Sequence, residues 1–105
     1  MIYTLDEIST LIKPIADKYK LNAVYLFGSY ARGEATENSD IDFVIDRYGT
    51  EIRRLIQLGA VYSDIENVLN KKVDVITLDS LCQEQQMPSE AIFRKNVFDE
   101  MIKIY

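Results

Sequence analysis

Two aspartates, Asp40 and Asp42, stand one residue apart in the segment Ser39-Asp40-Ile41-Asp42. Alternate residues of a strand point to the same face, so these two carboxylates could jointly hold a divalent cation. Earlier in the chain, Gly28 and Ser29 follow an apolar run, and a turn of this kind can present backbone N–H groups to phosphate. Phosphate binding beside metal-holding carboxylates is the combination that nucleotidyl transfer requires.

A third aspartate, Asp74, lies inside the apolar stretch 73–78. Strands disfavour aspartate, and burying a carboxylate without a partner is costly. Asp40, Asp42 and Asp74 together therefore suggest a cation that offsets these costs. The alternative is that each aspartate, taken alone, caps a strand end or pairs with a basic side chain.

The spacing of these residues carries a resemblance to a known family. Gly28 and Ser29 are followed by ten residues and then by Asp40-x-Asp42. This resembles the GSx10DxD signature of the DNA polymerase beta-type nucleotidyltransferase superfamily. The fuller string, Gly-Ser-Tyr-Ala-Arg-Gly and then Ser-Asp-Ile-Asp, resembles its smallest branch, the minimal nucleotidyltransferase (MNT) domains.

The resemblance implies a role for each matching carboxylate. Asp40, Asp42 and Asp74 would be the catalytic residues and the ligands of two Mg²⁺ ions, with ATP as the substrate. Asp74 would also polarise the attacking hydroxyl or accept its proton. Attack would fall on the α-phosphorus, and pyrophosphate would leave.

The resemblance also implies a set of nucleotide-binding residues. Glycine allows the close approach of backbone to phosphate, serine adds a hydroxyl, and a guanidinium matches phosphate oxygens. The alternative for the arginine is a surface ion pair with Glu34 or Glu37. The predicted nucleotide-binding residues are Gly28, Ser29, Arg32 and Ser39.

The acceptor is not defined by the motif. MNT domains are typically antitoxins paired with an all-helical HEPN ribonuclease toxin, so the resemblance implies AMP transfer from ATP to a tyrosine of such a partner. A second hypothesis keeps the chemistry and makes the acceptor a small molecule such as an aminoglycoside. A third is a non-catalytic antitoxin that neutralises its partner by masking it.

Composition narrows the function classes further. A length of 105 residues predicts a single domain over 1–105. The net charge of −5 argues against direct nucleic-acid binding, and the apolar runs are too short to span a membrane. The absence of histidine excludes His-based triads. The single cysteine, Cys82, predicts a cytoplasmic location and is expected to be a small buried residue.

Apolar runs predict strands at 23–27, 41–45 and 73–78. A capping box at Thr4 and Glu7 predicts a helix that Pro14 kinks or splits. A short helix is expected at 30–33, and Asp79 and Ser80 can cap another that runs through Glu84. A longer helix is expected from Pro88, and residues 101–105 fit either helix or edge strand. With the resemblance, this pattern predicts an α/β (α+β) fold, in which helices pack on a small mixed sheet like that of polymerase beta.

Residues 50–70 predict a helix with two apolar stripes that leave little polar circumference. Such a helix is either sunk in the core with one tolerated exposed edge or covered by a partner protein or a second copy in an oligomer. The first stripe holds Ile52, Leu55, Ile56, Gly59 and Ala60, and the second holds Leu58, Val61, Tyr62, Ile65 and Leu69.

Overall fold

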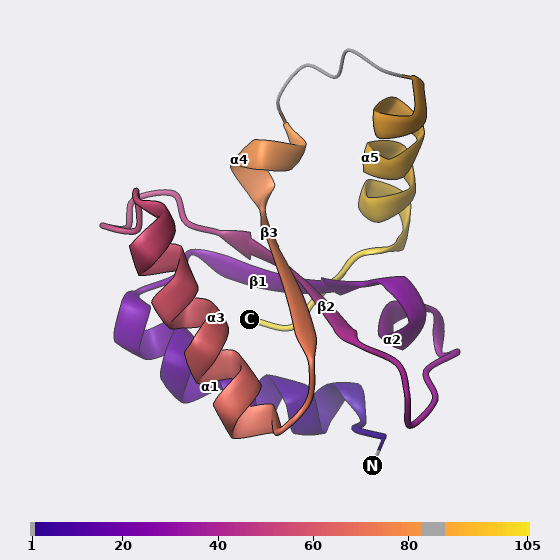
Figure 1. Cartoon of the computed structure of the whole chain (residues 1–105), viewed down its shortest axis with the longest axis horizontal. Coiled ribbons are helices and arrows are strands. Elements are labelled where there is room, and N and C mark those ends of the chain that lie inside the picture. Colours follow the sequence, from indigo (N-terminus) through magenta and orange to yellow (C-terminus); the bar gives the residue numbers. More distant parts are fainter. Residues whose placement is uncertain (1, 83–87) are drawn as a thin grey trace.

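A computed structural model describes residues 2–82 and 88–105 of the chain. It contains a four-stranded mixed sheet in the order β3-β2-β1-β4 (Figure 1). Strand β1 is antiparallel to both β2 and β4, whereas β2 and β3 are parallel. The predicted mixed sheet with packed helices is confirmed. The strands are β1 (Ala23–Phe27), β2 (Ile41–Asp46), β3 (Val73–Thr77) and β4 (Ile102–Lys103).

Helices α1 (Leu5–Tyr19) and α3 (Leu55–Leu69) cover one face of the sheet (Figure 1). The side chains between them and the sheet form the larger hydrophobic core. The second predicted stripe enters this core through Val61, Ile65 and Leu69, whereas of the first stripe only Ile52, which precedes α3, is buried in it. Other members of the core are Ile8, Ile12, Leu26, Ile41, Phe43, Ile45 and Val73.

The capping box at the start of α1 is confirmed. Thr4 N–H donates to Glu7 Oε1 at 2.9 Å, and Glu7 N–H donates to Thr4 Oγ1 at 3.1 Å. The predicted split at Pro14 is wrong, because α1 runs as one helix across it. Ile12 and Ile15 are buried on either side of the proline, and this packing offsets the single backbone hydrogen bond that proline removes.

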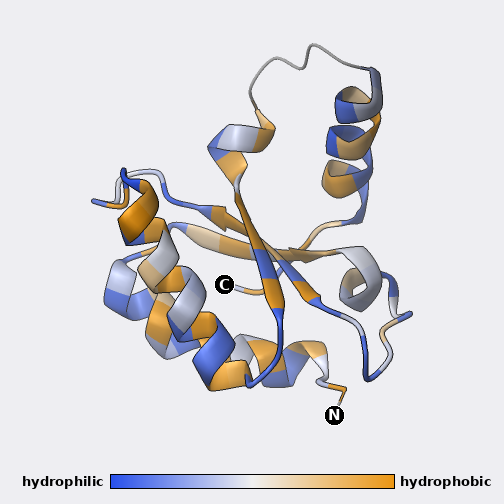
Figure 2. Ribbon diagram, viewed as in Figure 1, coloured by the Kyte–Doolittle hydropathy of each residue, from blue (hydrophilic) through white to orange (hydrophobic). Residues whose placement is uncertain are grey.

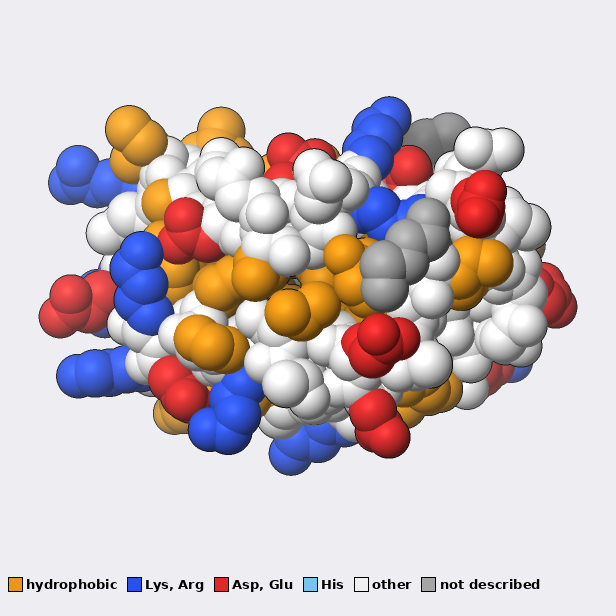
Figure 3. Space-filling model, turned by 90° about the horizontal axis from the view of Figure 1, so that it is seen from below, with side chains coloured by type: hydrophobic (Ala, Val, Ile, Leu, Met, Phe, Trp, Pro, Cys, Tyr) orange, Lys and Arg blue, Asp and Glu red, His pale blue; other side chains and the backbone are white. Residues whose placement is uncertain are grey.

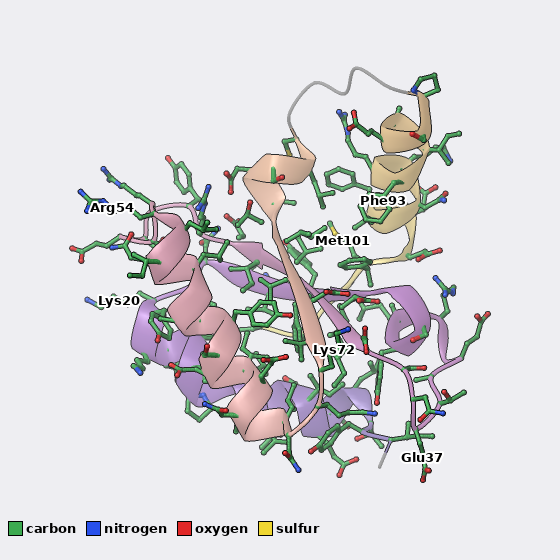
Figure 4. All side chains as sticks on the ribbon, in the orientation of Figure 1. Lys20, Glu37, Arg54, Lys72, Phe93 and Met101 are labelled. Carbon is green, nitrogen blue, oxygen red and sulfur yellow. The ribbon has the colours of Figure 1, made fainter. Side chains whose placement is uncertain are left out.

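The opposite face of the sheet carries a smaller core. Helix α5 (Pro88–Glu100) stands over this face, and the side chains of Phe93 and Met101 lie on its side of the sheet (Figure 4). The rings of Phe27 and Phe93 meet edge to face with centroids 6.2 Å apart. The buried members of this core are Phe27, Val44, Leu81 and Val97.

Several predicted boundaries shift. Helix α3 begins at Leu55, five residues after the predicted start, and α2 occupies Gly28–Arg32, two residues earlier than expected. Helix α4 (Leu78–Leu81) is capped by the Thr77 side chain, which accepts from Ser80 N–H at 3.3 Å. Asp79 does not provide this cap, because it forms a bidentate pair with Arg47 at 3.0 and 2.8 Å. Cys82 is exposed, so its predicted burial is wrong. The predicted extension of this helix through Glu84 lies outside the described residues.

The C-terminal residues form an edge strand, β4, which decides between the two alternatives left open by the sequence. Beyond it, Ile104 N–H donates to Val24 O at 2.9 Å and Ser9 Oγ donates to Ile104 O at 2.7 Å. In Figure 3, which views the molecule from the α1 side, hydrophobic side chains form a band across the middle of the face. None of the helices described is long and apolar enough to cross a bilayer.

Candidate active site

The parallel pairing of β2 and β3 sets Asp42 directly opposite Asp74. Because side chains alternate along a strand, both carboxylates share the face that carries Val44 and Ile76, on the α5 side of the sheet. Asp40 immediately precedes β2 and is half-buried. Two strands separated by a whole helix thus bring Asp42 and Asp74 to one face of the sheet.

The carboxyl group of Asp42 has a perturbed pKa. Burial of its carboxyl group and repulsion from Asp74 and Asp40 raise the pKa of Asp42 from 3.8 to about 6. A hydrogen bond from the protonated Asp42 carboxyl to Asp74 acts in the same direction, and the positive charge of Arg32 opposes it. Close carboxylates that resist joint ionisation form a site of strong negative potential, which a divalent cation would relieve.

Gly28 leaves the space that the Asp42 carboxylate occupies. The glycine follows β1 directly and has a φ of +72°, in the left-handed region. A Cβ atom at this position would lie 2.2 Å from Asp42 Oδ2. Both the backbone conformation and the contact therefore require glycine, and the turn that starts α2 lies against the carboxylate of β2.

The structure gives the other predicted nucleotide-binding residues local roles. Arg32 donates to Glu34 at 3.2 Å and to Glu100 of α5 at 3.0 Å. The ion pair with Glu34 is one of the two that the sequence offered as an alternative, and the ion pair with Glu100 was not predicted. Ser39 Oγ accepts from Thr36 N–H at 2.8 Å and so holds the loop before Asp40. The Ser29 carbonyl accepts from Glu34 N–H at 2.9 Å. Their roles toward a nucleotide stay predictions.

Two residues that were not predicted as site residues, Tyr62 and Lys71, hold the backbone segments that carry Asp74 and Asp40. Tyr62 of α3 donates its hydroxyl to the carbonyl of Val73, the residue before Asp74. Burial, followed by the charges of Glu66, Asp74 and Asp40, raises the pKa of Tyr62. Lys71 Nζ donates to Glu37 O at 2.9 Å and ties the loop before Asp40 to the start of β3. A tyrosine at helical spacing is indistinguishable in sequence from a core aromatic, so no sequence signal marks Tyr62.

The donor chemistry of this cluster fits magnesium. Mg²⁺ is commonly bound by one or two carboxylates, with phosphate and water oxygens completing its shell, and Asp42 and Asp74 form an adjacent pair of this kind. Within residues 2–82 and 88–105, no group of three or more Asp, Glu or Cys side chains forms a ready-made metal site. The assignment of Asp40, Asp42 and Asp74 as metal ligands therefore stays a prediction.

A comparison with models of protein families identifies the family to which this chain belongs. The model of the family described as "Polymerase beta, Nucleotidyltransferase" matches residues 10–104. The chain belongs to this nucleotidyltransferase family. The match covers every strand of the sheet and all the predicted site residues.

Relatives of this nucleotidyltransferase include proteins of archaea and bacteria. The protein MJ0126 of Methanocaldococcus jannaschii is 43% identical over 83 residues, covering 74% of this chain and 82% of its own length. The protein adenylyltransferase MntA of Thermococcus cleftensis is 33% identical over 82 residues, covering 74% and 81%. The protein adenylyltransferase MntA of Shewanella oneidensis is 28% identical over 99 residues, covering 90% and 70%.

Solved structures share the fold of this nucleotidyltransferase. A chain from a crystal structure of a toxin–antitoxin with AMP-PNP superposes with a TM-score of 0.69 at 22% identity, covering 92% of this chain and 72% of its own. A chain from a mutant of the toxin–antitoxin MntA-HpeT gives a TM-score of 0.66 at 19% identity, with 92% and 71% covered. At these identities the likeness establishes the fold alone.

The raised pKa of Asp42 predicts how the metal-free nucleotidyltransferase responds to pH. The folded chain holds the Asp42 proton up to about pH 6, whereas the unfolded chain releases it near pH 4. The folded state therefore binds more protons between these values, and the Asp42 contribution to the free energy of unfolding falls as pH rises through this window. Above it, Asp42→Asn should be more stable than the wild type in the presence of a chelator.

Urea unfolding of both proteins from pH 4 to pH 8 in EDTA measures this effect. The difference between wild type and Asp42→Asn isolates the Asp42 titration from those of the other carboxylates. A stability difference that stays constant across the range would show that burial and the neighbouring carboxylates do not raise the pKa of Asp42 in the folded chain.

Proposed function

We propose that this nucleotidyltransferase transfers AMP from ATP, with Mg²⁺, to a tyrosine of a HEPN toxin and so acts as its antitoxin. The observation that carries the proposal is the in-register pair Asp42 and Asp74, set against the turn at Gly28. The Asp42 carboxylate, which would help to hold the metal, thereby lies against the turn that would bind phosphate. The names of the relatives, protein adenylyltransferase MntA, support a protein acceptor.

Each predicted site residue would have a defined role in the reaction. The turn at Gly28 and Ser29 would hold the triphosphate, and Arg32 would exchange its exposed carboxylate partners for phosphate oxygens. Asp40, Asp42 and Asp74 would hold two Mg²⁺ ions, which supply stabilisation of the charge that develops on the attacking and leaving oxygens. The tyrosine oxygen forms a bond to the α-phosphorus while the bond to the β-phosphate oxygen breaks. Asp74, which is exposed, would orient the tyrosine hydroxyl and take its proton.

A protein acceptor also agrees with the exposed hydrophobic side chains of α3. The stripe of α3 that begins with Leu55 and Ile56 lies outside the core, as expected for a helix that contacts a partner. The solved structures that share the fold include toxin–antitoxin structures. These observations favour a toxin over a small-molecule acceptor.

Intact mass spectrometry of the candidate toxin tests the proposal. The protein encoded by the adjacent gene is incubated with this chain, Mg²⁺ and ATP, GTP, CTP or UTP in turn. The expected result is a mass increase of one or more AMP units with ATP, mapped to a tyrosine by fragmentation. EDTA should abolish the transfer, because the carboxylates alone provide neither the charge nor the geometry for the reaction.

Two other outcomes would assign the chain a different role. Transfer to an aminoglycoside without any protein partner would make it a small-molecule nucleotidyltransferase. Neutralisation of the toxin that survives replacement of Asp40, Asp42 and Asp74 by asparagine would make it a masking antitoxin. Either result contradicts the proposed function.

A further inference from the structure

The N-terminal end of α3 exposes large hydrophobic side chains that the core does not use. Tyr48, Leu55 and Ile56 are 85%, 84% and 80% exposed. The other exposed large hydrophobic side chains among the described residues are at most 61% exposed. Beside them stand Arg53 and Arg54, and Figure 4 shows Arg54 extending away from the helix. We call this surface the α3 tip; it comprises Tyr48, Arg53, Arg54, Leu55 and Ile56.

The fold does not require these side chains to be apolar. The segment before α3 is anchored by Ile52, which is 6% exposed, and by Thr50, whose hydroxyl donates to Arg47 O at 2.6 Å. The helix itself is held to the sheet by Val61 and the buried residues after it. Leu55 and Ile56 occupy its first turn, where polar residues would suit solvent better. Figure 2 shows this hydrophobic end of α3 at the rim of the molecule.

The charge of the α3 tip is opposite to that of the whole chain. Arg53 and Arg54 have no ion pair among the described residues, while the chain carries a net charge of −5. A neighbouring hollow of about 450 Å³ is lined in part by Lys18, Lys20 and Glu51. Lys18 pairs with Asp64 at 3.1 Å, so Arg53, Arg54 and Lys20 provide the positive charge here against Glu51. Figure 3 shows several basic side chains at the corresponding end of the molecule, with acidic ones between them. An acidic partner is therefore attracted here and repelled by most of the remaining surface.

We propose that the α3 tip docks the partner protein that this enzyme modifies, through a surface of that partner that is apolar and acidic. The inference rests on the proposed function. An acidic protein surface is favoured over an anionic membrane or a nucleic acid, because an extended polyanion would also meet the chain's excess of acidic residues. Two guanidinium groups beside apolar side chains suit a compact protein contact with an apolar centre and a charged rim.

Docking at the α3 tip is spatially separate from the chemistry. Helix α3 follows the C-terminal end of β2, whereas Asp40 and Asp42 mark the N-terminal end of that strand. The partner would thus be held at one end of the sheet while its tyrosine reaches the other. Binding energy at the tip would lower KM for the intact partner and leave kcat unchanged, because the tip does not contact the reacting atoms.

Binding and kinetics of tip variants test the inference. The double variants Leu55→Ser/Ile56→Ser and Arg53→Glu/Arg54→Glu are compared with the wild type in two assays. The first is calorimetric binding to the purified product of the adjacent gene without nucleotide. The second is AMP transfer to that protein and to a short peptide containing its modified tyrosine. Val68→Ser, on the same helix and 38% exposed, and Lys103→Glu, on β4, are the matched controls.

The expected result is a loss of affinity of about tenfold or more for both tip variants, a matching rise in KM for the intact protein, and an unchanged rate with the peptide. Thermal unfolding confirms that the variants are folded. Unchanged affinity in the tip variants, an equal loss in the controls, or loss of self-association or vesicle binding in place of partner binding would overturn the inference. Because the calorimetric assay contains no nucleotide, it measures docking even if no AMP is transferred and the proposed function fails.

Discussion

Asp42→Asn is expected to lower the rate of nucleotidyl transfer by about 1,000-fold while leaving the fold intact. The carboxylate is half-buried, opposite Asp74 and next to the turn at Gly28, so its oxygens lie at the centre of the predicted metal site. An asparagine of the same shape keeps the packing but removes the negative charge that binds the cation. Loss of ~4 kcal/mol of transition-state stabilisation corresponds to this factor.

Asp46→Asn provides the matched control for this prediction. Asp46 lies on the same strand, but at its other end, where it accepts from Asn22 Nδ2 at 2.7 Å and from Tyr48 N–H at 3.0 Å. Its replacement should change transfer by no more than about twofold. Single-turnover rates at saturating ATP and Mg²⁺ separate the two variants. Transfer by Asp42→Asn at the rate of Asp46→Asn would remove Asp42 from the catalytic group.

Gly28→Ala is the second change with a large expected effect. The new Cβ atom would lie 2.2 Å from Asp42 Oδ2, and the backbone φ of +72° is strained for any residue with a Cβ atom. The Asp42 carboxylate would have to move by about 1 Å, and a displacement of this size at a reacting centre costs about 100-fold in rate. The backbone strain should lower the free energy of unfolding by about 1–2 kcal/mol.

Gly33→Ala separates strain from displacement. Gly33 has a φ of +74°, nearly that of Gly28, but a Cβ atom there meets nothing within 4 Å. It should lose a similar amount of stability and keep its transfer rate. Urea unfolding and transfer assays on both alanine variants give the comparison. If Gly33→Ala loses as much activity as Gly28→Ala, backbone strain alone explains the effect and the contact with Asp42 is not decisive.

The core of the site could be predicted from sequence because its constraints are local. The segment from Gly28 to Asp42 follows β1 directly and holds the short helix α2, a loop and the start of β2, so that β2 returns antiparallel beside β1. The position of Asp74 was less determined, since its strand is separated from β2 by α3. Only the parallel register shows that it faces Asp42.

The failed predictions concern places where tertiary contacts override local pattern. The apolar pattern of residues 50–70 did not show that the helix would start only at Leu55, after the buried Ile52. Thr77 displaced Asp79 as the cap of α4 because Arg47, distant in sequence, engages the aspartate. Pro14 did not divide α1, since burial on both sides of it outweighs one lost hydrogen bond.

The central claim, that the carboxylates at 40, 42 and 74 hold divalent cations beside a bound nucleotide, is tested most directly by a Mn²⁺ titration. Electron paramagnetic resonance counts the bound ion in the presence of a non-hydrolysable ATP analogue, for the wild type and for the variant with all three aspartates replaced by asparagine. We expect about two ions per wild-type chain and loss of protein-bound Mn²⁺ in the variant. Equal binding by both proteins would contradict the account.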